Sequence, residues 1–181
     1  MNDVVIEQLV TKRPDTKTVL TKLLIIAAGI LVTSLPLIID ILFMPTEAQG
    51  SLLSLTPLTL AGAIFGMVVL FRRFNIEYEY ILTNGELDVD KIMGQRSRKR
   101  ILDSANCRAF DVLAPLTPEY QREYIKEQLK IMDLSSSPDA PDRWFAIFNR
   151  EKGGRTVLIF EPGERLLEGL KKFVPRSKIM K

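Results

Sequence analysis

A cluster of basic side chains is the part of this sequence best suited to bind a ligand. Residues 91–100 carry five positive charges and no negative one. Closely spaced ammonium and guanidinium groups bind phosphates and carboxylates, so one hypothesis is a patch that faces anionic lipid headgroups. The alternative is that these cations pair across a sheet with Glu77, Glu79, Asp88 and Asp90. The basic residues are Lys91, Arg96, Arg98, Lys99 and Arg100.

The residue types that most often carry catalysis are scarce. The chain of 181 residues contains no histidine, which excludes histidine general bases, histidine metal sites and Ser-His triads. Its one cysteine, Cys107, is expected to pack in a core rather than react. Residues 135–137 are serines with no visible base, and no glycine motif for binding phosphates is present. We therefore expect a protein that is not an enzyme and that holds no cofactor and no metal.

Two apolar runs precede the basic cluster. Residues 23–44 contain one charged residue, Asp40, and residues 52–71 contain none. Each run reaches the roughly 20 residues that a helix needs to cross a bilayer. Neither run keeps the polar stripe that is typical of helices on soluble proteins. The two runs predict a transmembrane helical hairpin over residues 23–71.

Lysine and arginine side chains predict the orientation of this hairpin. They precede the first run and follow the second, whereas the connecting residues 45–51 contain none. Because positive residues stay on the cytoplasmic side, we expect a multi-pass protein of the cell membrane with both termini in the cytoplasm. The flanking residues are Lys12, Arg13, Lys17, Lys22, Arg72 and Arg73.

Two features inside the spans have more than one interpretation. Asp40 is either an intramembrane proton or ion site or, as we expect from its place near the end of its run, a residue at the outer interface. Gly62 and Gly66 have the spacing that lets helices pack closely. Their expected partner is the first span, around Gly29, and the alternative partner is a second copy of the protein.

Residues 1–22 are expected to form a polar cytoplasmic leader. They contain one short apolar patch, from Val4 to Val10. This patch is either an interfacial helix that ends before Pro14 or part of a loosely ordered segment. In both interpretations the soluble domain begins only at residue 74.

Alternating apolar and charged residues open the soluble domain, which we place at residues 74–175. They predict a strand over 76–82. Asn84-Gly85 then predicts a two-residue hairpin and a returning strand over 86–93, which sets Glu79 opposite Asp90. Further strands are predicted near residues 96–102, 108–113, 129–134, 144–148 and 156–160.

Helical signals complete the domain. A short helix is expected after Thr117, and a longer amphipathic helix is expected from Pro162 to Pro175, which leaves residues 176–181 as a basic tail. About seven strands and a terminal helix predict an α+β fold. In this fold, the helical hairpin precedes a cytoplasmic β-sandwich or barrel whose open mouth the C-terminal helix caps.

This order of elements resembles the pleckstrin-homology-like (PH-like) domains of bacterial membrane proteins. The whole chain resembles an uncharacterised bacterial family in which two transmembrane helices precede such a domain. The resemblance rests on the paired spans, on YEYILTNGELDVDKI and on TVLIFEPGERLLEGLKKFVPR. It implies a fold and a location but no activity. Pleckstrin-homology domains that bind phosphoinositides usually use basic residues around the first hairpin loop, whereas the loop here, Asn84-Gly85, has none.

Our functional hypothesis is a non-enzymatic, membrane-anchored scaffold or adaptor that presents the PH-like domain to a protein partner. One alternative is sensing of an anionic lipid surface through Lys91 and residues 96–100. Another is an accessory subunit of a transport or secretion complex. A nucleic-acid partner is not expected, because the net charge of +3 at pH 7 is small.

Overall fold

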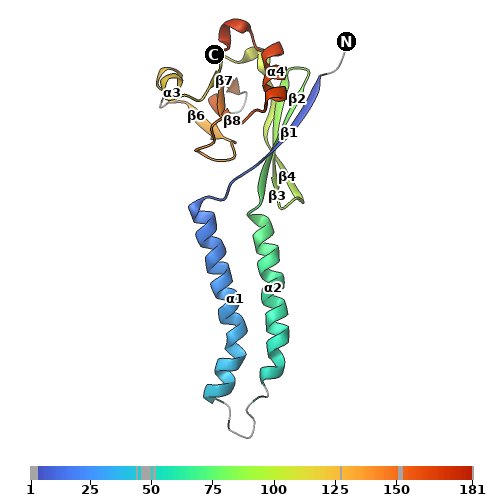
Figure 1. The fold of residues 1–181 in the computed structure, drawn as a ribbon. Helices are drawn as coiled ribbons and strands as arrows, with labels where there is room; N and C mark the ends of the chain where they lie inside the picture. The colour runs from blue at the N-terminus through green and yellow to red at the C-terminus, as the bar shows by residue number, and fades with distance from the viewer. Residues whose placement is uncertain are drawn as a thin grey trace. The chain divides into compact units, whose positions relative to one another are not determined.

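The structure is a computed structural model that describes residues 4–43, 45, 50, 52–126, 128–150 and 153–180. The chain forms two compact units (Figure 1). One is a helical unit, Pro14–Asn75. The other is a β-domain that combines the residues before Pro14 with those from Ile76 onward. The helical unit is therefore inserted within the sequence of the β-domain.

The helical unit is a pair of helices joined by a short connection. It contains α1 (Thr16–Phe43), the 3-10 turn η1 (Leu52–Leu55) and α2 (Thr56–Arg73). By length and composition, both α-helices could cross a membrane. α1 begins before the apolar run that predicted it, because the helix continues through a polar first turn.

The Asp40 side chain forms hydrogen bonds with the connection between the two helices. Its side chain is 3% exposed, and its carboxylate accepts backbone hydrogen bonds from Gly50 at 2.7 Å and from Leu52 at 3.3 Å. Leu52 is the first residue of η1. The carboxylate thus satisfies an N–H group that the start of a helix leaves without a backbone partner. Asp40 has a structural role at this end of α1.

The glycines of the helical unit differ in how closely they are packed. A side-chain carbon added at Gly29 of α1 would lie 3.2 Å from Sδ of Met67 in α2. A carbon added at Gly62 or Gly66 would meet nothing within 4 Å. These two glycines instead line an open groove of about 400 Å³ between the helices. The two helices do approach each other at Gly29, but there the neighbour is Met67, and Gly62 and Gly66 do not provide the predicted close packing.

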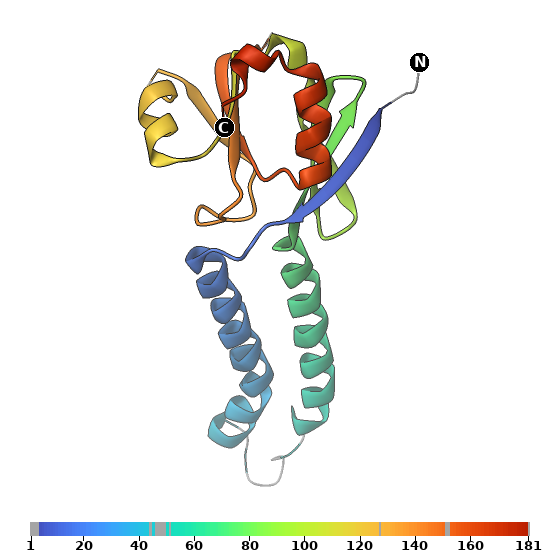
Figure 2. The same ribbon diagram turned by 45° about the horizontal axis from the view of Figure 1, so that its top comes forward.

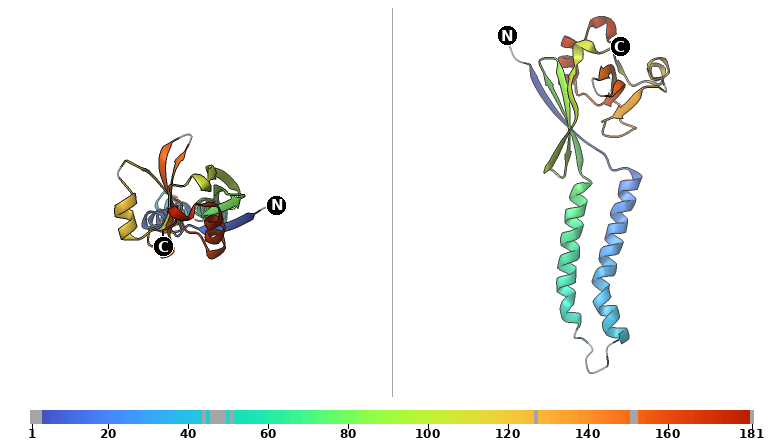
Figure 3. Two further views of the ribbon diagram at one scale, coloured as in Figure 1. Left: turned by 90° about the horizontal axis from the view of Figure 1, so that it is seen from above. Right: turned by 180° about the vertical axis from the view of Figure 1, so that it is seen from behind.

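The β-domain contains two four-stranded sheets, which are distinct in the view from behind (Figure 3). The first sheet is a meander of β1 (Val5–Thr11), β2 (Ile76–Thr83), β3 (Glu86–Met93) and β4 (Ser97–Asn106). The second sheet has the order β5-β7-β8-β6, and β6 runs parallel to β8. Its strands are β5 (Val112–Pro115), β6 (Lys130–Asp133), β7 (Trp144–Arg150) and β8 (Gly154–Phe160).

Strand β1 corrects the prediction of an N-terminal leader. Residues 5–11 form neither an interfacial helix nor a loose segment but pair with β2, from Val5 opposite Thr83 to Thr11 opposite Glu77. Inward and outward side chains alternate along β1, as they do in any half-buried strand. The partner strand lies beyond both helices in the sequence, so no local signal indicated the pairing.

This pairing also changes which loop is the first in the sheet. The connection between β1 and β2 is the helical unit itself. Asn84-Gly85 therefore joins the second and third strands of the sheet, not the first and second. The sequence analysis treated it as the first hairpin loop of a PH-like domain, and that assignment was wrong.

The hairpin at Asn84-Gly85 is confirmed in geometry and register. Asn84 and Gly85 have φ values of 51° and 94°, and Leu82 pairs with Leu87 as the two-residue loop requires. Glu79 lies opposite Asp90, as predicted. The following turn, Gly94-Gln95, also has positive φ at both residues.

The middle of the domain departs from the prediction in detail. The strand predicted over 108–113 is shifted to β5, because a 3-10 turn, η2 (Cys107–Ala109), comes first. The Asn106 side chain caps that turn by accepting a hydrogen bond from the backbone of Arg108 at 3.0 Å. The predicted helix is present as α3 (Pro118–Tyr124), with the Thr117 hydroxyl accepting from the backbone of Tyr120.

The C-terminal helix α4 (Glu164–Phe173) packs on the first sheet (Figure 2). A side-chain carbon at Gly169 would lie 2.5 Å from Ile6 of β1 and 2.9 Å from Leu82 of β2, so only glycine allows this close approach without movement. Gln8 of β1 accepts a hydrogen bond from the backbone of Gly163 at 2.7 Å. β1 thus supports the start and the middle of α4. The 3-10 turn η3 (Arg176–Lys178) follows this helix.

A buried tyrosine connects the two sheets. The Tyr80 hydroxyl donates a hydrogen bond to the backbone oxygen of Leu134 at 2.6 Å and accepts one from the backbone of Glu161 at 3.3 Å. Its ring meets Phe160 edge to face, with centroids 5.9 Å apart. Burial raises the pKa of the Tyr80 hydroxyl above its usual value, so this side chain stays protonated and keeps donating to Leu134.

Candidate functional site

The five basic residues are divided between the two faces of the first sheet. Arg100 pairs with Asp90, Lys99 with Lys91, and Arg98 with Ile92 across β3 and β4. Successive side chains of a strand point to opposite faces. Arg98 and Arg100 therefore share one face, and Lys91 and Lys99 share the other. The fifth residue, Arg96, lies in the turn before β4.

On the first of these faces, the arginines form an ion-pair ladder. Arg98 Nη1 lies 2.9 Å from Glu79 Oε2 and 3.7 Å from Asp90 Oδ2. Arg100 Nε lies 3.0 Å from Asp90 Oδ1, and this hydrogen bond, followed by the charge of Asp88, raises the pKa of Arg100. Glu79 and Asp90 are 9% and 2% exposed. Two buried like charges that face each other are unfavourable, so Arg98 and Arg100 are needed to neutralise them.

On the other face, the lysines have no such partners. Lys91 and Lys99 lie directly opposite each other in the ladder. Among the residues that the structure describes, no carboxylate lies within 4.0 Å of either ammonium group or of the Arg96 guanidinium. The Lys99 and Arg96 side chains are exposed, and Lys91 is half-buried. The sequence pattern placed all five cations in one patch, whereas the structure pairs Arg98 and Arg100 with carboxylates and leaves the other three, among the described residues, without a carboxylate partner.

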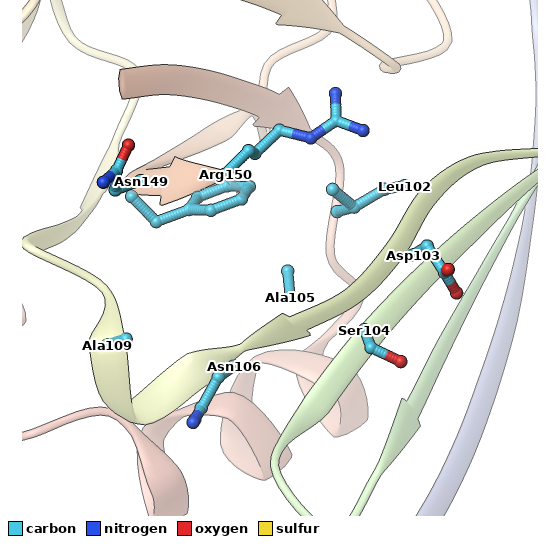
Figure 4. Close-up of a pocket in the computed structure, with 9 residues that line it drawn as sticks. Leu102, Asp103, Ser104, Ala105, Asn106, Ala109, Asn149 and Arg150 are labelled. Atoms are coloured by element: carbon cyan, nitrogen blue, oxygen red, sulfur yellow. The ribbon is translucent and has the colours of Figure 1, made fainter. Parts of the chain in front are cut away.

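A pocket that the sequence analysis did not identify lies between β4 and the end of β7 (Figure 4). Its volume is about 390 Å³. Leu102, Ala105 and Phe148 form a buried apolar part. The other lining residues are mostly exposed and polar, and one of them, Arg150, donates a hydrogen bond to the backbone oxygen of Ile101 at 3.4 Å. These other residues are Asp103, Ser104, Asn106, Ala109, Asn149 and Arg150.

Both strands beside this pocket have a free edge. Within the described sheets, β4 is hydrogen-bonded only to β3. β5 covers β7 as far as Ile147, so residues 148–150 extend beyond it. Unpaired strand edges offer rows of backbone N–H and C=O groups to another extended segment. No local sequence signal shows that these two strands line one pocket, because β4 and β7 are far apart in the chain.

Cys107 lies close in sequence to the residues that line this pocket, but its thiol is buried and cannot act as a nucleophile there. The side chain is buried, and its thiol donates weakly to the backbone oxygen of Ala105 at 3.8 Å. Burial raises the pKa of the thiol to about 12. The reactive thiolate is therefore almost absent near neutral pH, which agrees with the expectation that this cysteine packs in the core.

Comparison with known proteins agrees with the observed fold. A family model described as Bacterial PH-like domain (DUF6106) matches residues 2–180. The match includes β1, both long helices and the whole of the β-domain that follows them. No curated protein matches the chain, and no solved structure matches it. Since the match covers almost the full length, the chain belongs to this family of bacterial PH-like domain proteins.

Proposed function

We propose that this protein is a non-enzymatic scaffold of the cell membrane, with both termini in the cytoplasm and with its PH-like domain offered to a protein partner. The supporting observation is the insertion of the helical unit between two paired strands. Thr11 of β1 and Glu77 of β2 are direct partners. Four residues, 12–15, separate β1 from α1, and two residues, 74–75, separate α2 from β2.

Two short linkers from neighbouring strands restrict rotation of a domain more than one linker would. A single flexible linker allows a domain to turn freely, whereas two linkers fixed a few ångströms apart oppose that turning. Restricted rotation suits a domain that holds a partner in a defined orientation at the membrane. Affinity can then be modest, because the anchor already supplies a high effective concentration.

The pocket between β4 and β7 is the docking surface that this proposal assigns. An extended segment of the partner would bond to the free edge of β4, as strands do when they add to a sheet. A small apolar side chain of that segment would enter the part lined by Leu102, Ala105 and Phe148. The polar residues around it, such as Asn106 and Asn149, would bind the partner's backbone.

Site-specific crosslinking in cells should test this surface. A photoreactive amino acid at Asn106 is expected to give a discrete crosslinked product, and the same amino acid at Glu119, on the exposed side of α3, is not. Filling the pocket with Ala105→Met should remove the product, while Ala109→Met at its exposed margin should retain it. A product that is unchanged by Ala105→Met in a protein of unchanged thermal stability would contradict docking in this pocket.

The orientation in the membrane has its own test. A cysteine at Pro45, in the connection between the helices, should react with an impermeant thiol reagent added outside intact cells. A cysteine at Lys172, which is exposed on α4, should react only after the cells are opened. Native Cys107 does not interfere, because it is buried. Reaction of the Lys172→Cys variant in intact cells would contradict the cytoplasmic placement of the β-domain.

A further inference from the structure

We infer that the Lys91–Lys99 pair, together with Arg96, binds the phosphate groups of anionic lipid headgroups in the cytoplasmic leaflet. This inference goes beyond the scaffold role and uses residues at the start of β4, whereas the pocket is lined by residues toward the end of that strand. It assigns a ligand to the three basic residues that the ion-pair ladder leaves without carboxylate partners.

The first argument is the cross-strand lysine pair itself. Lys91 and Lys99 are direct Cα partners in the antiparallel pair of β3 and β4. Directly opposed like charges destabilise a sheet. On the opposite face, the structure neutralises Glu79 and Asp90 with two arginines. An external anion between the two ammonium groups would remove the corresponding repulsion on the lysine face.

The second argument is the reach of the chain. Arg73 ends α2, and Ile76 begins β2 three residues later, so their Cα atoms lie within about 11 Å in any arrangement of the two units. Met93 is the direct partner of Ile76, and antiparallel partners are about 4.5–5.5 Å apart. The turn that carries Arg96 follows Met93 at once. When α2 crosses a membrane, this hairpin turn therefore cannot leave the neighbourhood of the headgroups.

The third argument is the energetic scale. A basic residue near an anionic leaflet is favoured by about 1 kcal/mol, which is about a fivefold change in population. The attraction extends over a Debye length of about 8–10 Å at physiological salt. Because the anchor already holds the domain at the membrane, this attraction sets the tilt of the domain rather than its location. Binding of lipid phosphates by Lys91 and Lys99 would favour one orientation of the first sheet relative to the membrane plane.

The test uses the full chain in lipid nanodiscs of phosphatidylcholine alone and of phosphatidylcholine mixed with phosphatidylglycerol. A fluorophore is attached to Gln95→Cys in the hairpin turn, where the side chain is exposed. Lipids with a spin label on the headgroup quench the fluorophore on contact. We expect quenching to increase with phosphatidylglycerol and to weaken at high salt, as an interaction with exposed charges should.

The decisive variant is Lys91→Gln/Lys99→Gln. It should lower the ratio of lipid-contacting to detached hairpins in phosphatidylglycerol discs by about fivefold for each lysine removed. The matched control, Lys130→Gln/Lys172→Gln, removes two exposed lysines elsewhere in the domain and should quench like the wild type. Lys91→Arg/Lys99→Arg keeps the charge and should also keep the dependence on phosphatidylglycerol.

Two results would overturn the inference. One is equal quenching of the wild type and of Lys91→Gln/Lys99→Gln in both kinds of disc. The other is wild-type quenching that does not depend on phosphatidylglycerol. If the glutamine variant does not fold, the wild type and the arginine variant still decide the question, since both must respond to phosphatidylglycerol.

Discussion

Removal of residues 1–13 should unfold the β-domain rather than trim a dispensable end. β1 contributes Val10 to the core and places Ile6 against Gly169 of α4. Gln8 also bonds to the backbone of Gly163 and of Glu161, at 2.7 Å and 2.9 Å. Burial of one aliphatic side chain stabilises by about 1.5–3 kcal/mol and a hydrogen bond by about 0.5–1.5 kcal/mol. Two such side chains and two such hydrogen bonds together give about 4–9 kcal/mol, which is comparable with the roughly 5–15 kcal/mol by which a whole domain is stable.

Two water-soluble variants would measure this effect. In the first, a short glycine-rich turn replaces residues 14–75, which is feasible because the backbone N–H of Lys12 already bonds to the oxygen of Ile76 at 2.8 Å. The second variant is residues 76–181 alone. The joined variant should unfold in one cooperative transition on heating, and the shorter one should show no such transition. Equal melting temperatures would show that β1 is not part of the stable fold.

Gly85→Val should destabilise the domain by at least about 2 kcal/mol, from backbone strain together with overpacking. Gly85 has a φ of 94°, which a β-branched residue rarely adopts. A side-chain carbon at this position would also lie 2.8 Å from Cδ1 of Phe173. The substitution therefore strains the hairpin and displaces the end of α4 together. Chemical denaturation of the full chain in detergent, followed through the single tryptophan, Trp144, would measure the loss.

A second glycine separates the two causes. Gly154 also has positive φ, at 73°, but a side-chain carbon there would meet nothing within 4 Å. Gly154→Val should therefore show the backbone strain alone and a smaller loss than Gly85→Val. Phe173→Ala combined with Gly85→Val should recover part of the packing loss, as a double-mutant cycle would reveal. Equal decreases in the free energy of unfolding for the two glycine variants would mean that the contact with Phe173 adds nothing to the effect of Gly85→Val.

The sequence predicted those parts of the fold that depend on neighbouring residues. The hairpin at Asn84-Gly85 follows from the φ values that such a loop needs, and its register follows from the loop length. The caps of α3 and the apolar face of α4 are likewise local patterns. The two long helices follow from hydropathy alone.

The features that could not be predicted depend on distant pairing. β1 has a period-two pattern, but seven residues are too few to distinguish a strand from a short amphipathic helix without knowledge of its partner. The parallel pairing of β6 with β8 and the pocket beside β4 depend on tertiary structure in the same way.

The division of the basic cluster required the register of β3 with β4. The sequence showed that Arg98, Lys99 and Arg100 alternate along one strand. It did not show that Lys91 is the residue opposite Lys99, or that Asp90 is opposite Arg100. Only that register separates two structural arginines from the lysine pair to which we assign a ligand.

The position of the helical unit between β1 and β2 has a consequence for biosynthesis. The ribosome completes β1 before either helix exists, and β2 emerges only after both. At about 5–20 residues per second, β1 waits several seconds for its partner. A chain in which only one helix had inserted would leave β1 and β2 on opposite sides of the bilayer, where they could not pair. If both helices cross the membrane, closure of the first sheet therefore requires that both have inserted, and we expect a chain with one inserted helix to leave the edge of β2 unpaired.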